Sequence, residues 1–309
     1  MAELGYIHHS YGKLSATHRN SSSNTMTLPD NAELKARERR AWAAVADGWM
    51  RRDEVLAWGA APVTARMLEL AGISAGDRVL DIASGVGEPA ISAARLAGAT
   101  GRVVGIDLVE DMIVHAREKA AGAGVTNLEF HCMDGETLDF EAATFDAATC
   151  RWGLMFMPEP ETCLRRVNHV MKEGARLVLA CWAEPQKNPF VGLLLQTLGK
   201  YTVLPVPPPG APGIFALADP DRLHQVIEAA GFRDIAIEAL EINVVEVDDG
   251  QAYWDTMSDL AAPVMTLVEQ LADTVRDAFI EDVITTADAL RQDDTLRMPG
   301  TTWVASALK

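Results

Sequence analysis

The central part of the chain alternates between short apolar runs and longer stretches whose apolar residues recur with helical spacing. The apolar runs predict strands, and the stretches between them predict helices over 88–98, 110–122 and 159–173, the last ending at Gly174. Strands that alternate with helices form right-handed crossovers and a parallel sheet between helical layers. The fold class is therefore α/β, with a doubly wound, mostly parallel sheet. The predicted strands of this part are 77–83, 102–108, 127–133, 145–151 and 175–183.

The flanking segments complete the expected organisation. Residues 1–25 show no sustained period and predict a disordered tail, with a more ordinary N-terminus from Met26. Residues 26–74 predict a helical N-terminal lead that ends at Gly72. The cofactor-binding core is expected over 75–185 and continues over 217–248, where a helix begins at Asp219-Pro220 and a strand follows over 232–246. A final core strand, Thr302–Leu308, lies within the last segment, 296–309.

Two insertions interrupt this core. Residues 186–216 combine a short helix with the stiff Pro205–Gly210 stretch, and 249–295 are expected to be helical from Ala252 to Leu290. Ligands of open α/β sheets bind outside the carboxyl ends of the strands, so the two insertions are predicted to form a lid there. The apolar stripe from Leu260 to Val283 needs a partner, either the first insertion or a second copy of the chain in a homodimer. Alternatively, both insertions only stabilise the domain.

Composition narrows the range of partners. The net charge of −17 over 309 residues argues against DNA, RNA and anionic membranes and favours a small-molecule substrate. No apolar run approaches the roughly 18 residues of a membrane span. The four cysteines show no metal-binding spacing, which predicts no metal site and free thiols in a reducing cytoplasm. They are Cys132, Cys150, Cys163 and Cys181.

The turn after the first strand carries the main chemical signal. Gly85 and Gly87 let the backbone approach a ligand without a Cβ, and a helix opening at Glu88 would point free N–H groups at it. Asp107 ends the second strand twenty residues after Gly87, where a carboxylate can accept both hydroxyls of a ribose. Because Gly85-x-Gly87-x-x-Ala90 also satisfies the dinucleotide fingerprint, an NAD-dependent dehydrogenase is an alternative.

Three further features favour S-adenosylmethionine over NAD. Asp81 lies inside the first strand, where a carboxylate can reach the ammonium group of an amino-acid cofactor. Asp134 and Gly135 follow the third strand, where an acid can accept the amino group of adenine. The sheet also lacks the second βαβαβ half that a dinucleotide requires.

These stretches resemble the class I S-adenosylmethionine-dependent methyltransferases, and among them the small-molecule group around the ubiquinone/menaquinone C-methyltransferases. Val79–Ala90, Val103–Met112, Phe130–Glu136 and Phe145–Pro158 match in order and spacing. The resemblance implies a seven-stranded Rossmann-like sheet whose last strand lies antiparallel between the fifth and sixth. Such families usually have glycine at the position of Ala83, where alanine is tolerated if φ is negative.

The resemblance also implies roles for individual residues. Leu108 and Met112 would enclose the adenine, and Arg151 would contact the cofactor carboxylate or an acceptor oxygen unless it forms a structural ion pair. The full set implied for the cofactor is Asp81, Ala83, Ser84, Gly85, Gly87, Asp107, Leu108, Met112, Asp134, Gly135, Glu136 and Arg151. The candidates for an apolar acceptor pocket, each with core packing as its alternative, are Trp49, Trp152, Met155, Phe156, Phe190 and Phe215.

The expected function is methyl transfer from S-adenosyl-L-methionine to a small, partly apolar molecule, at oxygen or carbon. An in-line displacement from an activated sulfonium depends mainly on positioning and on exclusion of water. None of the histidines in the core has a neighbour that marks it as a base, so the sequence predicts no catalytic residue. The alternatives are an NAD-dependent oxidoreductase and a non-catalytic protein that binds S-adenosylmethionine.

Overall fold

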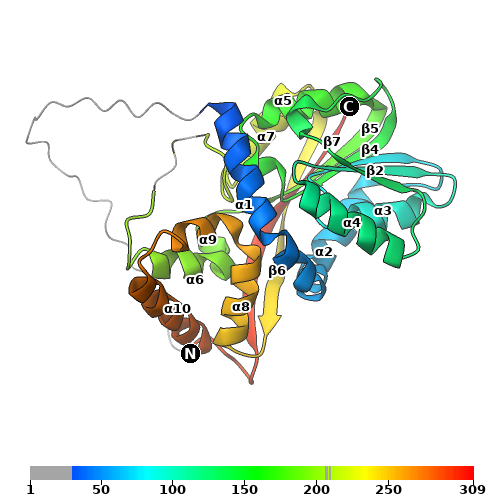
Figure 1. Ribbon diagram of the computed structural model, residues 1–309. Helices are drawn as coiled ribbons and strands as arrows, with labels where there is room; N and C mark the ends of the chain where they lie inside the picture. Colours follow the sequence, from blue (N-terminus) through cyan, green and yellow to red (C-terminus); the bar gives the residue numbers. More distant parts are fainter. Residues whose placement is uncertain (1–29, 206–207, 209) are drawn as a thin grey trace, which may run out of the picture.

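A single seven-stranded sheet organises the protein, as the computed structural model shows for residues 30–205, 208 and 210–309 (Figure 1). The predictions for residues 1–25, and for Val206, Pro207 and Pro209, lie outside the described residues. The strand order is β3-β2-β1-β4-β5-β7-β6. The strands are β1 (Arg78–Ile82), β2 (Arg102–Asp107), β3 (Leu128–Cys132), β4 (Phe145–Arg151), β5 (Met171–Trp182), β6 (Arg233–Val247) and β7 (Leu296–Leu308).

The predicted Rossmann-like fold is confirmed, and the sheet is mixed. The pairings among β3, β2, β1, β4 and β5 are parallel, whereas β7 is antiparallel to both β5 and β6. Parallel register brings the carboxyl ends of neighbouring strands to one edge, as with Asp81 of β1, which lies beside Gly105 of β2 and Thr149 of β4. That edge is where ligands of open α/β sheets bind.

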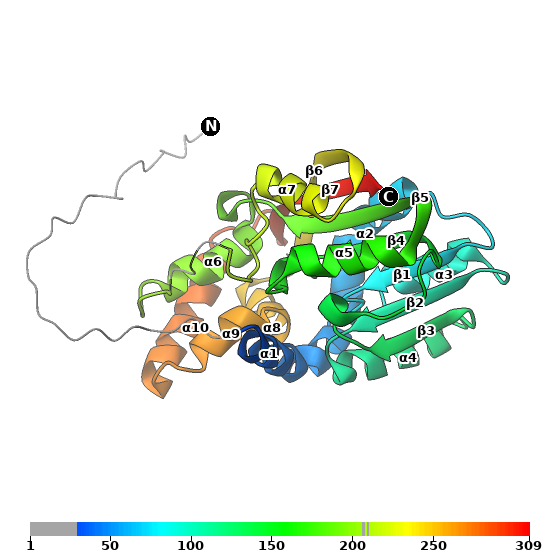
Figure 2. The ribbon, with the colours of Figure 1, turned by 90° about the horizontal axis from the view of Figure 1, so that it is seen from above.

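Helices pack against both halves of this sheet. α3 and α4 lie along β1, β2 and β3, while α2 crosses β4 to β7, and α5 and α7 pack together along β5 and β6. Figure 2 shows α1 beside α8 and α9, on the side of the molecule away from α7. The helices are α1 (Asn31–Arg51), α2 (Asp53–Ala71), α3 (Ala90–Ala97), α4 (Glu110–Gly122), α5 (Pro160–Val170), α6 (Pro189–Leu198), α7 (Pro220–Ala229), α8 (Gly250–Leu260), α9 (Ala262–Val268) and α10 (Asp273–Asp288), with the 3₁₀ turns η1 (Gly135–Thr137), η2 (Leu154–Phe156) and η3 (Pro185–Lys187).

Two predicted helix boundaries are wrong. The helix expected at Glu88 begins at Ala90, since the Glu88 side chain instead accepts the N–H of Ser92. The helix expected over 159–173 ends at Val170, because Met171 is fully buried and pairs with Phe145 of β4. The chain then passes through Gly174, a glycine with positive φ that lies within β5 rather than at the helix end.

The helical insertion is broken rather than continuous. α8 ends at Leu260, and a second helix starts at once with Pro263 in its first turn, where proline is tolerated. Its apolar stripe finds a partner within the chain, since α6 of the first insertion packs against α9 and α10. Phe279 of α10 meets Tyr201 and Trp254 edge to face. Figure 1 shows these four helices gathered where β6 and β7 extend beyond the other strands. No helix in the described ranges combines the length and apolarity that crossing a bilayer requires.

A buried hydrogen bond joins the two insertions and provides a stability test. The hydroxyl of Tyr253 in α8 donates to the carbonyl oxygen of Phe190 in α6 over 2.7 Å, and Tyr253 is fully buried. Tyr253→Phe is expected to lower the free energy of unfolding by about 1 kcal/mol, because water cannot replace the bond. Urea denaturation followed by circular dichroism measures this loss.

Tyr201→Phe is the matched control for this substitution. Its hydroxyl also donates to a backbone carbonyl, that of Ala278, but near the surface, where water can take its place. We expect a loss below about 0.5 kcal/mol. Equal losses in the two variants would show that burial of the Tyr253 hydrogen bond adds nothing to the free energy of unfolding.

Candidate active site

The turn after β1 is tied to the end of β2 by one carboxylate. Asp107 accepts the N–H of Gly85 at Oδ2 over 2.9 Å and the N–H of Val109 at Oδ1 over 3.0 Å. Burial raises the pKa of Asp107 above its ordinary value, while these backbone N–H groups act in the opposite direction. Gly85 has φ of +51°, and a Cβ there would meet no atom within 4 Å, so the backbone is open towards the edge of the sheet.

Ala83, which opens this turn, has φ of +54°. The condition under which alanine was expected to be tolerated, a negative φ, is therefore not met. An alanine in the left-handed region costs roughly 1–2 kcal/mol relative to the right-handed one. Trp152, after β4, also has positive φ, and a Cβ at the following Gly153 would lie 2.2 Å from the Cβ of Ala83. Two strained turns thus meet at the methyl group of Ala83.

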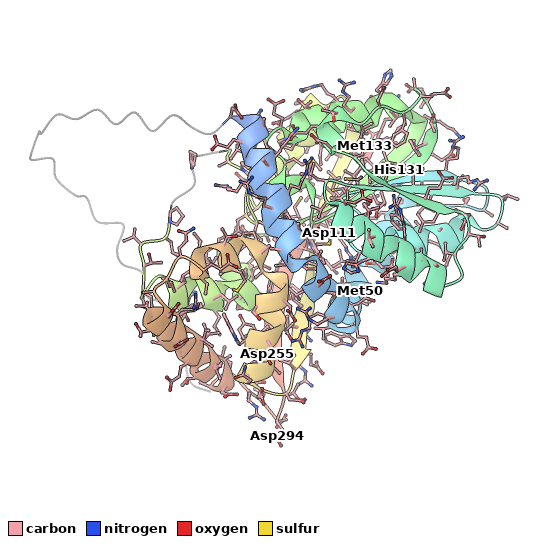
Figure 3. The ribbon with its side chains drawn as sticks, in the orientation of Figure 1. Met50, Asp111, His131, Met133, Asp255 and Asp294 are labelled. Atoms are coloured by element: carbon pink, nitrogen blue, oxygen red, sulfur yellow. The ribbon has the colours of Figure 1, made fainter. Side chains whose placement is uncertain are left out.

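A cavity lies at this edge, between the strand ends and α1. Figure 3 shows Met133, one of its lining residues, after β3 and near α1, while Asp294 marks the far end of the molecule. The strand-end turns and the start of α4 supply one wall, and α1 and α2 supply the other. Of the residues predicted from the sequence, the cavity is lined by Ala83, Ser84, Gly85, Asp107, Leu108, Met112, Asp134, Gly135, Glu136 and Arg151, and by Trp49, Trp152 and Phe156.

Two residues predicted for the cofactor lie behind this wall. Asp81 is fully buried, and its Oδ1 accepts the hydroxyl of Thr149 over 2.7 Å. Burial raises the pKa of Asp81 to about 7, although Thr149 and the nearby Arg151 oppose the shift. Gly87 is not a lining residue either, and a Cβ there would lie 2.9 Å from Cδ1 of Ile91. Asp81 thus links β1 to β4, and Gly87 leaves room for Ile91 of α3.

Three of the predicted acceptor-pocket residues do not line the cavity, which corrects that expectation. Met155 is a buried residue of η2, and Phe190 packs in the core with its ring centroid 4.6 Å from that of Trp182. Phe215 packs against the main core. In the described parts of 186–216 and 249–295, no residue lines the cavity, so these insertions do not form its wall. α1, which lines the cavity, packs against α8 and α9 of the second insertion.

Apart from Trp49, which was a candidate for the acceptor pocket, the residues that α1 and α2 contribute to this wall were not predicted from the sequence. Lys35, Glu38 and Trp42 follow one another at helical spacing on α1, and Asp53, Leu56 and Ala57 come from α2. This spacing shows that the first three residues share a helix face, but it does not show what the face covers. That information resides in contacts with residues far away in the chain.

Lys35 makes the strongest of these long-range contacts, with two carboxylates in the loop after β3. Its ammonium lies 2.7 Å from Oδ2 of Asp134 and 2.6 Å from Oε2 of Glu136, across the mouth of the cavity. Burial acts to lower the pKa of Lys35, but the two carboxylates together raise it above the ordinary value. The other oxygen of Asp134 accepts the N–H of Glu136. The loop after β3 is thereby clamped to α1.

Arg151 presents a buried guanidinium to the cavity. It donates to the hydroxyl of Thr64 over 2.5 Å and to the carbonyl oxygen of Glu88 over 3.1 Å. Burial lowers its pKa, with Glu88 and Asp81 opposing. No carboxylate of the described residues lies within ion-pair distance of Arg151, so the structural ion pair considered from the sequence does not form in this part of the chain. Its remaining N–H groups are available to an anionic ligand.

Aromatic rings fill the space under α1. Trp42 meets Phe156 edge to face at 5.1 Å and Trp49 at 5.6 Å between ring centroids. Trp42 and Trp49, with Leu108 and Met112, belong to a small apolar cluster that is separate from the main core, whereas Phe156 packs against the main core. This end of the cavity is therefore apolar, whereas the strand-end turns are polar.

The residues present fit S-adenosylmethionine. The hydroxyl oxygen of Ser84 is buried, has no hydrogen-bond partner among the described residues, and belongs to the lining of the cavity. Arg151 has spare donors for a carboxylate, and Asp107 offers a carboxylate at the position of a ribose. A polar wall with donors and acceptors beside an apolar space suits a charged cofactor and an apolar co-substrate.

Fold and cavity thus define an S-adenosylmethionine-dependent methyltransferase, and the comparisons with known proteins agree. Residues 48–206 match the ubiE/COQ5 methyltransferase family, about half of the chain. Among curated proteins, the ubiquinone/menaquinone biosynthesis C-methyltransferase UbiE of Pseudomonas putida is 30% identical over 197 residues, 59% of this chain and 75% of that protein. The same enzyme of Teredinibacter turnerae is 32% identical over 181 residues, 53% of this chain and 70% of that protein. The chain belongs to the ubiE/COQ5 methyltransferase family, and its cofactor is S-adenosylmethionine.

Solved structures share the fold. The YcgJ protein of Bacillus subtilis aligns with a TM-score of 0.51 and 18% identity, over 80% of this chain and 97% of its own. Phosphoethanolamine N-methyltransferase 2 of Haemonchus contortus, solved with phosphomonomethylethanolamine and S-adenosylhomocysteine, aligns with a TM-score of 0.51 and 15% identity, over 91% of this chain and 60% of its own. At these identities the likeness concerns the fold alone.

A double-mutant cycle can test the contact between Ala83 and Gly153 in the two strained turns. Gly153→Ala is expected to lower the free energy of unfolding by about 1–3 kcal/mol, because its methyl group would overlap that of Ala83. Ala83→Gly removes the obstacle and relieves the left-handed alanine, so alone it should change stability by less than about 1 kcal/mol. In the double variant most of the loss should be recovered.

Urea denaturation of the four proteins measures this cycle. A coupling energy of about 1 kcal/mol or more is expected for two groups in direct contact. Ala148→Gly, in the buried middle of β4, is the control for removing a methyl group, and it should destabilise by about 1 kcal/mol. If the effects of Ala83→Gly and Gly153→Ala simply add, the described contact is wrong.

Proposed function

We propose that this methyltransferase acts on a small aromatic acceptor that carries a hydroxyl group, and that it methylates a ring carbon. The observation that supports an aromatic acceptor is the cluster of Trp42, Trp49 and Phe156 in the cavity beside the polar turns. The names of the relatives, ubiquinone/menaquinone biosynthesis C-methyltransferases, support carbon and a quinone-type ring. A sulfonium methyl group is an electrophile, so the acceptor ring should be the electron-rich hydroquinone form.

Specific residues are proposed to hold the cofactor. Asp107 accepts hydrogen bonds from the ribose hydroxyls, while Leu108 and Met112 enclose the adenine. Asp134 accepts the adenine amino group with an oxygen that it also offers to Lys35, which its free lone pairs permit. The cavity position of each residue supports its role.

At the other end of the cofactor, Arg151 and Ser84 are proposed to donate to the carboxylate, and Gly85 lets the backbone approach. Bound here, the cofactor supplies a methyl group already activated by its sulfonium sulfur. The protein then has to orient the acceptor carbon and keep water away, a task that the aromatic rings of α1 and η2 suit. A cavity enclosed in this way, together with a net charge of −17, supports a small molecule rather than a nucleic acid as acceptor.

An acceptor panel tests the proposed function. Radiolabelled S-adenosylmethionine is incubated with alkylated hydroquinones, phenols, prenyl compounds, amines and tRNA, and each product is analysed by mass spectrometry and NMR. Label on a ring carbon of a hydroquinone is the expected result. Label on tRNA or on an amine, or tight cofactor binding without any turnover, would contradict the proposal. The last outcome would indicate a protein that binds the cofactor without catalysis.

The cofactor site has its own test in Asp107. Asp107→Ala should weaken binding of S-adenosylhomocysteine by about 1–3 kcal/mol, roughly 5- to 150-fold, because hydrogen bonds to a charged group are lost. Asp111→Ala is the matched control, since Asp111 is exposed in the first turn of α4 (Figure 3), and it should bind like the wild type. Isothermal titration calorimetry measures both. Binding of NADH more tightly than S-adenosylhomocysteine would contradict the assignment.

A further inference from the structure

Glu38 is a largely buried carboxylate in the cavity, and the proposed contacts with the cofactor do not involve it. Its side chain is only 12% exposed, and it lines the cavity from α1. Oε2 is buried and has no hydrogen-bond partner among the described residues, while the nearest cation, Arg37, lies 3.8 Å from Oε1. A buried carboxylate oxygen without a partner is costly, so such a group points to a ligand that donates to it.

The other carboxylates in the cavity wall are engaged differently. Asp53 pairs with Lys119 over 2.5 Å, and Asp134 and Glu136 share Lys35. Asp107 and Glu88 accept backbone N–H groups. In the described part of the chain, Glu38 alone among the lining carboxylates has a buried oxygen that nothing occupies.

The surroundings of Glu38 suit an aromatic ring with a polar substituent. Trp42 follows one helical turn later on the same face of α1, and its ring meets that of Phe156 from η2. An acceptor ring that packs among these side chains could direct a hydroxyl at the carboxylate.

We propose that Glu38 is the general base that takes the proton of the acceptor's hydroxyl group. This inference rests on the proposed function. As the hydroxyl O–H bond breaks, its proton moves to Oε2, and the electron pair released into the ring attacks the methyl group. A carbon–carbon bond forms, the carbon–sulfur bond breaks, and its electron pair stays on sulfur as S-adenosylhomocysteine. The ring carbon then loses its own proton to water, and Glu38 returns the first proton to the oxygen.

The electrostatic setting of Glu38 supports its role as a base. Burial raises the pKa of Glu38 above its ordinary value, whereas Arg37 and the indole of Trp42 act to lower it. A carboxylate with a raised pKa is a stronger base than an exposed one. The other charged groups that face the cavity are Lys35 on α1, Asp53 on α2, Glu88 after β1, Asp107 on β2, Lys119 on α4, Asp134 and Glu136 at η1, and Arg151 on β4.

Glu38→Gln keeps the shape of the side chain and removes the base. With an alkylated hydroquinone as the probe and saturating S-adenosylmethionine, kcat at neutral pH should fall about 100-fold or more. The wild-type rate should rise with pH as Glu38 loses its proton. The kcat of the variant should not show this rise. It should increase only as the pH approaches the acceptor hydroxyl's own pKa of about 10. A more acidic phenol should show a smaller defect. A merely structural role would produce neither pattern.

Two measurements separate this role from the alternatives. Calorimetry with S-adenosylhomocysteine should give the same affinity for Glu38→Gln within about threefold, or roughly 0.7 kcal/mol. Glu33→Gln removes a carboxylate from the exposed first turn of α1 and should behave like the wild type. Thermal unfolding followed by circular dichroism checks that both variants are folded.

The outcomes are distinct. If the wild type methylates the hydroquinone and Glu38→Gln matches it at every pH, Glu38 is not the base, although the proposed function stands. Weakening of S-adenosylhomocysteine binding by more than about tenfold, with kcat unchanged, makes Glu38 a cofactor ligand and overturns the inference. If the wild type binds the cofactor but methylates no hydroxyl-bearing acceptor, the proposed function and this role fail together.

Discussion

The carboxylate of Asp107 accepts the N–H groups of Gly85 and Val109, and so joins the turn after β1 to the start of α4. Because the carboxyl ends of β1 and β2 lie side by side, one side chain holds both turns in place. The rest of the cavity depends on this arrangement. The turn after β1 sets the position of Ala83 against Gly153 after β4, and the start of α4 places Leu108 and Met112 beneath α1.

α1 is held over the cavity by means that differ from those of the core. Its apolar face belongs to a small cluster with the turns after β1 and β2, and the attachment is completed by an ion pair between Lys35 and Asp134 and a hydrogen bond between His115 of α4 and Asp47. Partly exposed ion pairs contribute little individually, and small satellite clusters open more easily than a core. A cover of this kind can admit a ligand and still exclude water when closed.

The second insertion packs against α1, the helix that lines the cavity. Trp49 donates its indole N–H to the carbonyl oxygen of Leu260 at the end of α8, and Arg51 and Arg52 both bind Asp259. The apolar side chains of the two insertions instead pack against one another, between α6 and the helices α8 to α10. This explains why Phe190 lies in the core although the segment that carries it was expected to cover the acceptor.

The sequence by itself determined the strands, most helices, the acidic strand end at Asp107 and the glycine turn, because each depends on periodicity or turn chemistry within about a dozen residues. The resemblance added the antiparallel last strand. Only the tertiary structure decided the rest. Lys35 meets Asp134 across 99 residues of sequence, so no local pattern could assign Lys35 or Glu38 of α1 to the cavity wall. The positive φ of Ala83 likewise arises where two strand ends meet, and an apolar side chain such as Met155 fits a core or a pocket equally well until its neighbours are known.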